Sequence, residues 1–177
     1  CRSKKSNLIF ASTSSVYGDT NDFPISEKFS TDKPIQYYAA TKKSNEVMAY
    51  SYSKLFNIKT VGLRFFTVYG PWGRPDMSLF KFTKNILLNK EIEVFNNGKH
   101  YRDFTYIDDI VSGIIKSISF INKDKKNKNL FEIFNLGRGK SISLKEFIKW
   151  TELAIGKNAK KKYLGKQKGD IYKTHCD

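Results

Sequence analysis

Tyr38 and Lys42 stand four positions apart in the stretch YYAATKK (37–43). On a helix this spacing places both side chains on one face, one turn apart. Tyrosine ordinarily has a pKa of about 10, so it acts as a base at neutral pH only where positive charge lowers that pKa. An ammonium group about 5 Å away supplies roughly 3 kcal/mol at an effective dielectric of about 20, or about two pKa units. The pair is therefore a candidate for proton abstraction, although exposed helices also contain such pairs.

Four hydroxyl side chains precede this pair in an unbroken row. Ser12 ends the largely apolar run NLIFAS (7–12), which has the length of a buried strand, and Thr13, Ser14 and Ser15 follow it directly. Such a row is either a polar loop or a set of hydrogen-bonding groups at a reacting centre. For Ser14 and Ser15, satisfying backbone groups is as good an interpretation as contacting a substrate.

A strand, a helix and a second strand are expected to position these groups. The helix at 36–56 is followed by KTVGLRF (59–65), a second short apolar run. This order indicates a βαβ unit and hence a parallel sheet covered by helices. Along one face of the expected helix lie Val47, Met48, Ser51, Tyr52 and Leu55.

After Pro71 the elements become shorter, which predicts a smaller α+β lobe folded onto the first part. Helices are expected at 78–90, from a cap at Asp108 or Asp109 to about 121, and from a capping box of Ser143 and Glu146 to about 154. Strands are expected at 92–95 and 102–106, around the turn NNGK, and at 130–136.

Composition and charge limit the possible functions. Forty per cent hydrophobic residues in 177 support a packed core rather than disorder. The net charge of +15 is concentrated in lysines at 122–129 and 156–169, but no stacking motif or zinc spacing accompanies it. A basic surface equally attracts a small anionic substrate. No apolar stretch approaches the roughly 18 residues that span a bilayer, so we expect neither a nucleic-acid nor a membrane partner.

The two cysteines, Cys1 and Cys176, lie at opposite ends of the chain without metal-ligand spacing. Two free thiols in a reducing cytoplasm are favoured over a terminal disulfide, and no metal site is expected. The first residue is cysteine rather than methionine, which favours a fragment of a longer protein.

The order and spacing of several motifs resemble a known superfamily. The strand ending in STSS, the Tyr-x-x-x-Lys pair and LRFFTVYGP (63–71) are similar to the extended short-chain dehydrogenase/reductases. Within them, RFFTVYGPWGRPDM (64–77) and VFNNGKHYRDFTYIDDI (94–110) most resemble the UDP-glucuronate 4-epimerases among the nucleotide-sugar epimerases. The resemblance extends over essentially the whole chain, and it implies NAD as cofactor and a UDP-sugar as substrate.

The resemblance also implies roles for individual residues. Thr13 takes the position of the catalytic Ser/Thr, Tyr38 that of the base, and Lys42 that of its electrostatic partner. The implied cofactor-binding residues are Ser12, Tyr38, Lys42, Phe65 and Val68. The implied substrate-binding residues are Ser14, Ser15, Thr67, Arg74, Phe95 and Arg102. For three of them a structural alternative remains open: Phe95 as core, Arg102 as a surface ion-pair partner, and Arg74 as a solvated loop residue.

One departure from the family concerns the dinucleotide site. The family binds the NAD pyrophosphate through a G-x-G-x-x-G turn, and this chain has none; Gly137 and Gly139 are followed by Ile142 where the third glycine would stand. The predicted fold class is therefore α/β, the C-terminal part of a Rossmann-like parallel sheet with a smaller α+β substrate-binding lobe. Residues 1–70 are assigned to the NAD-binding domain and 71–177 to a lobe that is incomplete at its C-terminus. Alone, the chain is expected neither to hold NAD tightly nor to turn over.

The implied reaction is C4 epimerisation of a UDP-hexuronic acid, UDP-glucuronate to UDP-galacturonate, through a transient 4-keto sugar. The related 4,6-dehydratases and decarboxylases have acidic residues after the catalytic threonine, where this chain has Ser14 and Ser15. A non-catalytic nucleotide- or RNA-binding relative would usually lack the tyrosine or the lysine. Members of the family commonly pair the helix corresponding to 36–56 between subunits, which predicts a homodimer.

Overall fold

A parallel sheet of three strands forms one end of the molecule in the computed structural model, which describes residues 1–123 and 130–177. The strands pair in the order β1-β2-β6, all parallel, as the predicted strand–helix–strand unit requires. Most of the lysine-rich stretch at 122–129 lies outside the described residues. The strand bounds are β1 (Leu8–Thr13), β2 (Thr60–Phe65) and β6 (Phe131–Leu136).

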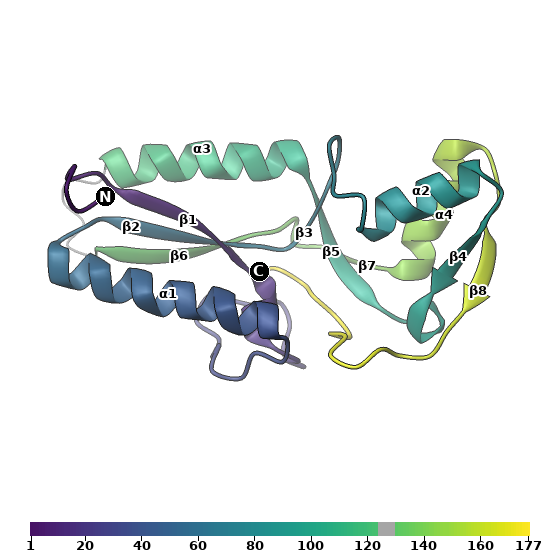
Figure 1. The fold of residues 1–177 in the computed structure, drawn as a ribbon, viewed down its shortest axis with the longest axis horizontal. Helices are drawn as coiled ribbons and strands as arrows, with labels where there is room; N and C mark the ends of the chain where they lie inside the picture. Colours follow the sequence, from purple (N-terminus) through teal and green to yellow (C-terminus); the bar gives the residue numbers. More distant parts are fainter. Residues whose placement is uncertain (124–129) are drawn as a thin grey trace.

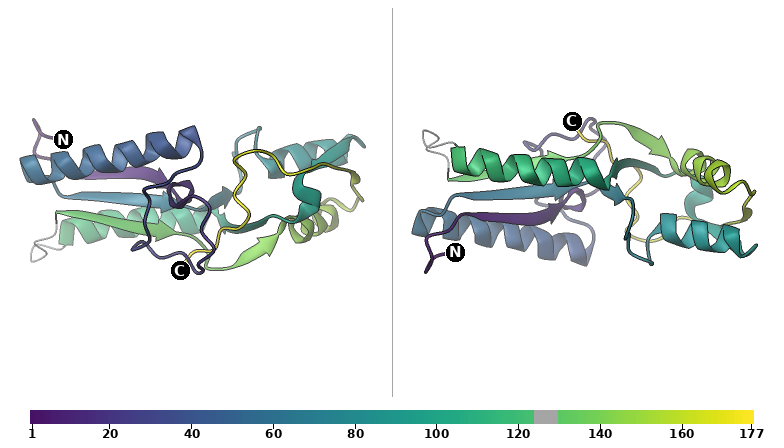
Figure 2. Two further views of the ribbon diagram at one scale, coloured as in Figure 1. Left: turned by 90° about the horizontal axis from the view of Figure 1, so that it is seen from below. Right: turned by 90° about the horizontal axis from the view of Figure 1, so that it is seen from above.

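Two long helices cover opposite faces of this sheet (Figure 1, Figure 2). Helix α3 (Ile107–Lys123) packs Ile121 against Val61 and Leu63 of β2, so the α3 side of the sheet is apolar. Helix α1 (Tyr37–Phe56) ends at Asn57, whose left-handed backbone lets the N–H of the next residue, Ile58, bond to the carbonyl of Ser53 at 3.1 Å. The predicted parallel α/β arrangement is confirmed.

The inward face of α1 differs from the expected apolar face. The residues that α1 buries are Ala39, Glu46 and Ser53. Val47, Met48, Tyr52 and Leu55 are all more than half exposed. In the described part of the chain, the apolar stripe of α1 is therefore left exposed, and the helix contacts β1 through polar groups.

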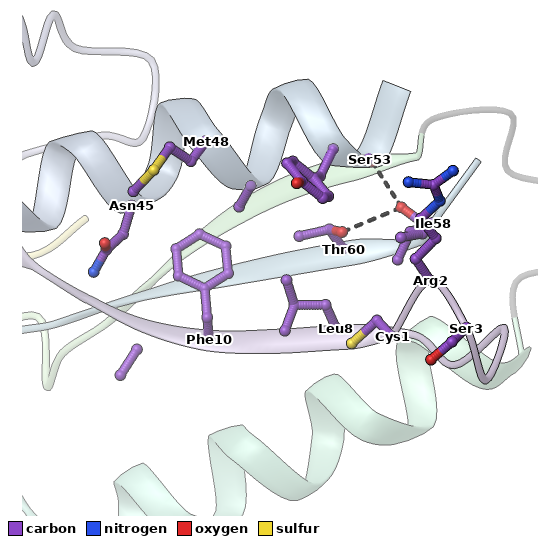
Figure 3. A pocket seen from close by; sticks show the side chains of 13 residues that line it. Cys1, Arg2, Ser3, Leu8, Phe10, Asn45, Met48, Ser53, Ile58 and Thr60 are labelled. Atoms are coloured by element: carbon purple, nitrogen blue, oxygen red, sulfur yellow. Dashed lines mark hydrogen bonds between the residues drawn. The ribbon is translucent and has the colours of Figure 1, made fainter. Parts of the chain in front are cut away.

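An open groove runs along β1 beside α1. Strand β1 pairs only with β2 among the described strands, so its other edge is open. The groove has a volume of about 760 Å³, and Phe10 of β1 and Met48 of α1 reach into it (Figure 3). Its wall also includes Leu8, Tyr52 and Ile58.

The other end of the molecule holds two smaller sheets and two helices (Figure 1). Strand β5 pairs with β3 in parallel and with β7 antiparallel, and β4 pairs with β8 in parallel. The bounds are β3 (Thr67–Tyr69), α2 (Ser78–Leu87), β4 (Glu91–Val94), β5 (Tyr101–Tyr106), β7 (Ser141–Ser143), α4 (Leu144–Ile155) and β8 (Lys160–Tyr163). A core cluster joins these elements, with the rings of Phe104 and Phe147 stacked at a centroid distance of 4.2 Å.

Two details of this lobe differ from the sequence-based expectation, and a third agrees with it. The two strands around NNGK do not pair with each other, because Asn96 and Asn97 take left-handed backbone conformations and β4 turns toward β8. Helix α3 begins at Ile107, so Asp108 and Asp109 lie in its first turn rather than at its cap, where they still favour the helix dipole. The predicted cap at Ser143 is confirmed: Ser143 Oγ accepts a 3.1 Å hydrogen bond from the N–H of Glu146, the first half of a capping box.

The chain crosses between the two ends more than once. Although α3 and β6 come after residue 70, they lie on the first sheet, so the assignment of all of 71–177 to the second lobe does not describe them. The C-terminal segment also returns from β8 to the carboxyl end of β1 (Figure 1). There Cys176 and Ile25 pair through their backbones in an isolated parallel β-bridge.

A fully buried carboxylate, that of Asp103, holds this crossing together. It accepts hydrogen bonds from the backbone N–H groups of Arg138 (2.9 Å), Gly139 (3.0 Å) and Cys176 (3.1 Å). The glycine-containing turn at 137–139 thus directs its N–H groups at a side chain of the same chain.

The two cysteines are free, as expected, and burial raises the pKa of the Cys176 thiol to about 12. Within residues 1–123 and 130–177, no helix is long and apolar enough to cross a membrane.

Candidate active site

The hydroxyl row lies at the carboxyl end of β1, where the backbone enters a 3₁₀ turn at Ser14–Tyr17. Thr13 Oγ1 accepts a 3.2 Å hydrogen bond from the N–H of Ser15 and donates to Ser15 Oγ at 3.3 Å. Thr13 and Ser14 are buried and Ser15 is partly buried. Part of the row therefore caps its own turn. The substrate contacts predicted for Ser14 and Ser15 stay predictions.

Tyr38 and Lys42 lie one turn apart in the first half of α1, on one face as their spacing predicts. Lys42 Nζ is 5.9 Å from the centroid of the Tyr38 ring. The same ammonium donates a 3.1 Å hydrogen bond to the carbonyl oxygen of Ala11, two residues before Thr13. The structure thus brings the lysine to the strand that carries the threonine, while Tyr38 is about half exposed at 52%.

A buried ion pair, Arg64–Glu46, is hydrogen-bonded to Ser12, the residue before Thr13. Arg64 of β2 donates to both carboxylate oxygens of Glu46 on α1, from Nε to Oε1 at 2.9 Å and from Nη2 to Oε2 at 2.8 Å. Ser12 Oγ donates to Glu46 Oε1 at 2.6 Å. Burial alone would raise the pKa of Glu46, but the hydrogen bonds from Arg64 and Ser12 outweigh it and hold that pKa below its usual value.

The network continues beyond the ion pair. Arg64 Nη1 donates to the hydroxyl of Tyr17 at 2.8 Å, and that hydroxyl donates to Asn135 Oδ1 of β6 at 2.6 Å. The guanidinium also lies over the Tyr17 ring, 4.7 Å from its centroid. Burial is the main cause of the raised pKa of Tyr17. Strands β1, β2 and β6 are thereby connected to α1 and to the 3₁₀ turn.

Sequence reasoning missed Glu46 and Arg64. Two signals were present: Glu46 stands four residues after Lys42, on the same helical face, and Arg64 is a charge near the end of the predicted buried strand at 59–65. Ser12, predicted as a cofactor-binding residue, gives its hydroxyl to Glu46, so its role toward a cofactor stays a prediction.

A second cavity, of about 590 Å³, lies in the smaller lobe. Thr67, Phe95 and Arg102, all predicted to bind substrate, line it together with His100 and Asp170. Phe95 is partly buried at this cavity and is not a member of the described core clusters, which argues against a purely structural role.

Arg102 lies in this cavity without a carboxylate partner among the described residues. Its Nη1 donates to the carbonyls of Tyr101 (2.9 Å) and Tyr172 (3.3 Å). Burial lowers the pKa of the guanidinium, and the charge of Asp170 opposes this only in part. A partly buried cation that lines a cavity and has no carboxylate partner fits an anionic ligand better than a surface ion pair.

The remaining predicted site residues do not line either cavity, although Asp76, the partner of Arg74, lies on the wall of the second. Arg74 is exposed, and its guanidinium forms two hydrogen bonds to Asp76, Nε to Oδ1 at 3.0 Å and Nη2 to Oδ2 at 2.5 Å. This matches the solvated-loop alternative for the chain as described. Phe65 packs against the core at the end of β2, and Val68 is partly buried in β3. The structure does not test the cofactor contacts predicted for Phe65 and Val68.

Curated proteins similar to this chain are about twice its length. Protein CapI of Staphylococcus aureus is 47% identical over 182 residues, which cover 97% of this chain and 54% of that protein. A probable UDP-glucuronate 4-epimerase of Rhizobium meliloti is 41% identical over 181 residues, which cover 95% of this chain and 53% of that protein. The chain thus spans about half the length of the curated relatives it matches.

A solved structure and a family model also match this chain. The UDP-glucuronic acid 4-epimerase from Bacillus cereus, solved in complex with UDP-glucuronic acid and NAD, has a TM-score of 0.85 and 37% identity, covering 96% of this chain and 52% of that one. The family model for the NAD dependent epimerase/dehydratase family matches residues 1–137, more than half of the chain. The resemblance predicted from the sequence motifs is confirmed: this chain belongs to the NAD-dependent epimerase/dehydratase family.

Proposed function

We propose that this chain supplies the proton-transfer groups and the substrate lobe of an NAD-dependent enzyme that inverts C4 of a UDP-hexuronic acid, converting UDP-glucuronate to UDP-galacturonate. The observation that supports this most is the bond from Lys42 to Ala11, because it brings the Tyr38–Lys42 pair to the strand end that presents Thr13. Ligands of α/β sheets bind outside the carboxyl ends of the strands, where Thr13 lies.

The residues present fit one end of the cofactor. Thr13, Tyr38 and Lys42 surround the place where a nicotinamide and its ribose would lie, and the bound cofactor would supply reversible hydride acceptance at C4. No free glycine-rich turn for a pyrophosphate exists in the described chain, since the N–H groups of Arg138 and Gly139 bond to Asp103. That part of the cofactor site is proposed to lie in the half of the enzyme that this chain does not span.

In the proposed reaction the chain's own residues move one proton. Tyr38, as a phenolate, takes the proton of the sugar 4-hydroxyl, and the ammonium of Lys42 stabilises the negative charge of the phenolate. Thr13, held at the strand end by its bond with Ser15, shares a proton with the same hydroxyl. Tyr38 returns this proton to the C4 oxygen when the hydroxyl is re-formed with the opposite configuration.

The cavity of the smaller lobe is proposed to take the UDP part of the substrate. Arg102 would bind the diphosphate, because its charge lines the cavity and has no carboxylate partner within hydrogen-bond reach among the described residues. Phe95, on the wall of the same cavity, would contact the uracil ring.

The uronate carboxylate is proposed to bind Arg74 and Thr67. A 4-keto uronic acid is a β-keto acid, which loses CO2 readily when its carboxylate can rotate out of the ketone plane. Hydrogen bonds that restrain this rotation favour epimerisation over decarboxylation. Arg74 offers a planar fork for this purpose, and a substrate carboxylate would replace Asp76 on it.

Two further proposals concern the complete protein. The open edge of β1 and the groove beside it (Figure 3) suit further strands and helices from the half of the enzyme that this chain does not span. The exposed apolar residues of α1, among them Val47 and Leu55, suit pairing of this helix in a homodimer.

We expect the enzyme to work in the cytoplasm.

Turnover of matched substrates by the complete enzyme tests the proposed function. UDP-glucuronate should be converted to UDP-galacturonate without net formation of NADH, as followed by chromatography and absorbance at the reduced-cofactor band. UDP-glucose, which lacks the carboxylate, is the control and should react poorly. Equal turnover of both substrates would reduce the assignment to an unspecific nucleotide-sugar 4-epimerase, and conversion of neither would refute it.

A further inference from the structure

We propose that Glu46 and Arg64 are positioning residues: the buried pair sets how α1, with Tyr38 and Lys42, faces the Thr13 strand end. This inference rests on the proposed function, since it assigns a role within the same reaction. Neither residue touches the place proposed for the reacting atoms. Both act through the groups that they hold.

The pair is unusual among the ion pairs of the described chain. The exposed fractions of its two side chains are 6% and 5%, whereas each other described pair has at least one partner exposed by more than a quarter. A buried ion pair adds little net stability compared with an apolar pair of similar volume. It does fix geometry, because the guanidinium fork binds a carboxylate in one plane.

The geometry that it fixes is the contact between α1 and β1. Glu46 holds Ser12 through a 2.6 Å hydrogen bond, and Lys42, one turn earlier on α1, holds the carbonyl of Ala11 at 3.1 Å. Two consecutive residues of β1 are thus bound by two residues of α1 on one helical face. A rotation of α1 about its axis would break both bonds and move Tyr38 relative to Thr13.

Arg64 also holds the residues that follow the hydroxyl row. Through Tyr17 it holds the end of the 3₁₀ turn that follows Thr13, and through Glu46 it holds the residue that precedes Thr13. The threonine is therefore held on both sides by one guanidinium. Removing the fork would leave the turn and the helix free to shift independently.

Ser12→Ala in the complete enzyme is the milder test, because it removes one hydrogen bond and no charge. Ser53→Ala is its matched control: Ser53 is fully buried in the same helix and donates to the carbonyls of Ile58 and Leu130, remote from Thr13. We expect Ser12→Ala to lower kcat about tenfold with an unchanged KM for UDP-glucuronate and an unchanged NAD content. Ser53→Ala should leave kcat unchanged.

Arg64→Lys is the stronger test, because it keeps the charge and removes the fork. Its control is Glu152→Gln, which disrupts the Glu152–Lys161 pair (2.6 Å) at the far end of the smaller lobe. We expect Arg64→Lys to lower kcat by about 10- to 100-fold per folded molecule, with unchanged UDP affinity, and Glu152→Gln to leave kcat unchanged. The folded fraction is measured by thermal unfolding of each variant.

A wild-type kcat in both Ser12→Ala and Arg64→Lys would overturn the inference. So would a decrease in activity that is fully explained by the smaller folded fraction of each variant. If Arg64→Lys does not fold, the comparison of Ser12→Ala with Ser53→Ala decides. An inactive wild-type enzyme would refute the proposed function instead, so the two failures are distinguishable.

Discussion

Lys42 and Ala11 are joined by a 3.1 Å hydrogen bond from the lysine ammonium to the backbone carbonyl, which ties the first half of α1 to the last residues of β1. The bond unites two motifs that lie far apart in the sequence, the hydroxyl row and the Tyr-x-x-x-Lys pair. The lysine is thereby directed at the strand end rather than at solvent.

Tyr38→Phe in the complete enzyme should lower kcat by several powers of ten while leaving the affinity for UDP-glucuronate nearly unchanged. The hydroxyl acts mainly in the transition state, so its loss affects turnover more than binding. Steady-state kinetics and calorimetric titration measure the two effects. Tyr37→Phe, at a neighbouring side chain that is 87% exposed, is the control and should behave as wild type. Near-normal turnover of Tyr38→Phe would remove this tyrosine from the mechanism.

Arg102→Met should weaken UDP binding by about 1.5–3 kcal/mol, the range for a hydrogen bond to a charged group. The loss follows because the Arg102 guanidinium, which lines the cavity of the smaller lobe, is the proposed diphosphate partner. Isothermal titration with UDP measures it. Arg138→Met removes the same charge from an exposed position and serves as control. Equal affinities of the two variants would show that only general charge attracts the nucleotide.

The strands and helices near the reacting groups were predictable because their patterns are local. The run at 7–12, the helix at 36–56 and the capping box at Ser143 each follow from neighbouring residues. Strands β3 and β8 were not predicted, since one continues almost directly from β2 and the other is an exposed run of lysines ending in tyrosine. Their pairing depends on partners distant in the sequence, which periodicity does not reveal.

The positions of the candidate site residues in the fold were predictable only in part, and their roles stay predictions. The Tyr38–Lys42 pair and Thr13 follow from spacing and motif, whereas the Glu46–Arg64 pair requires knowing that α1 meets β2 through a polar contact. Arg74 shows the opposite case: its motif position predicts a substrate contact, but its exposed fork is bound to Asp76 in the chain as described.

Glu46→Gln should reduce the free energy of unfolding at neutral pH, and this difference should shrink in acid. The pKa of Glu46 in the folded protein lies below its ordinary value of 4.5. The ionised carboxylate therefore stabilises the fold above pH 4.5, and this stabilisation is lost as the pH falls through the lowered folded-state pKa. Urea unfolding of wild type and variant between pH 7 and pH 3 measures the difference. A gap that stays constant over this range would contradict the assignment.

Asp103→Asn should destabilise the fold by about 2–3 kcal/mol, because an amide accepts through only one oxygen and directs N–H groups at the backbone donors of Arg138, Gly139 and Cys176. Chemical denaturation of the two proteins gives the difference. Asp109→Asn, at an exposed position in the first turn of α3, is the control and should change stability by less than about 1 kcal/mol. Equal effects of the two substitutions would contradict the role assigned to Asp103.

Arg74→Ala should lower kcat/KM for UDP-glucuronate by about 10- to 100-fold, and a decarboxylated UDP-pentose should accumulate as a by-product. Both effects follow if Arg74 restrains the carboxylate of the 4-keto intermediate. Product analysis by chromatography and mass spectrometry separates them. An Arg74→Ala enzyme that turns over UDP-glucuronate normally and forms no pentose would place the carboxylate elsewhere.

The most direct test of the central claim is an NMR time course of UDP-glucuronate with the complete enzyme in D2O. The account predicts that UDP-galacturonate appears, that its C4 keeps the original hydrogen and that no deuterium enters at C4, because the carbon-bound hydrogen is transferred and returned within the site. Absence of the C4 epimer, or deuterium at C4 in the product, would contradict it.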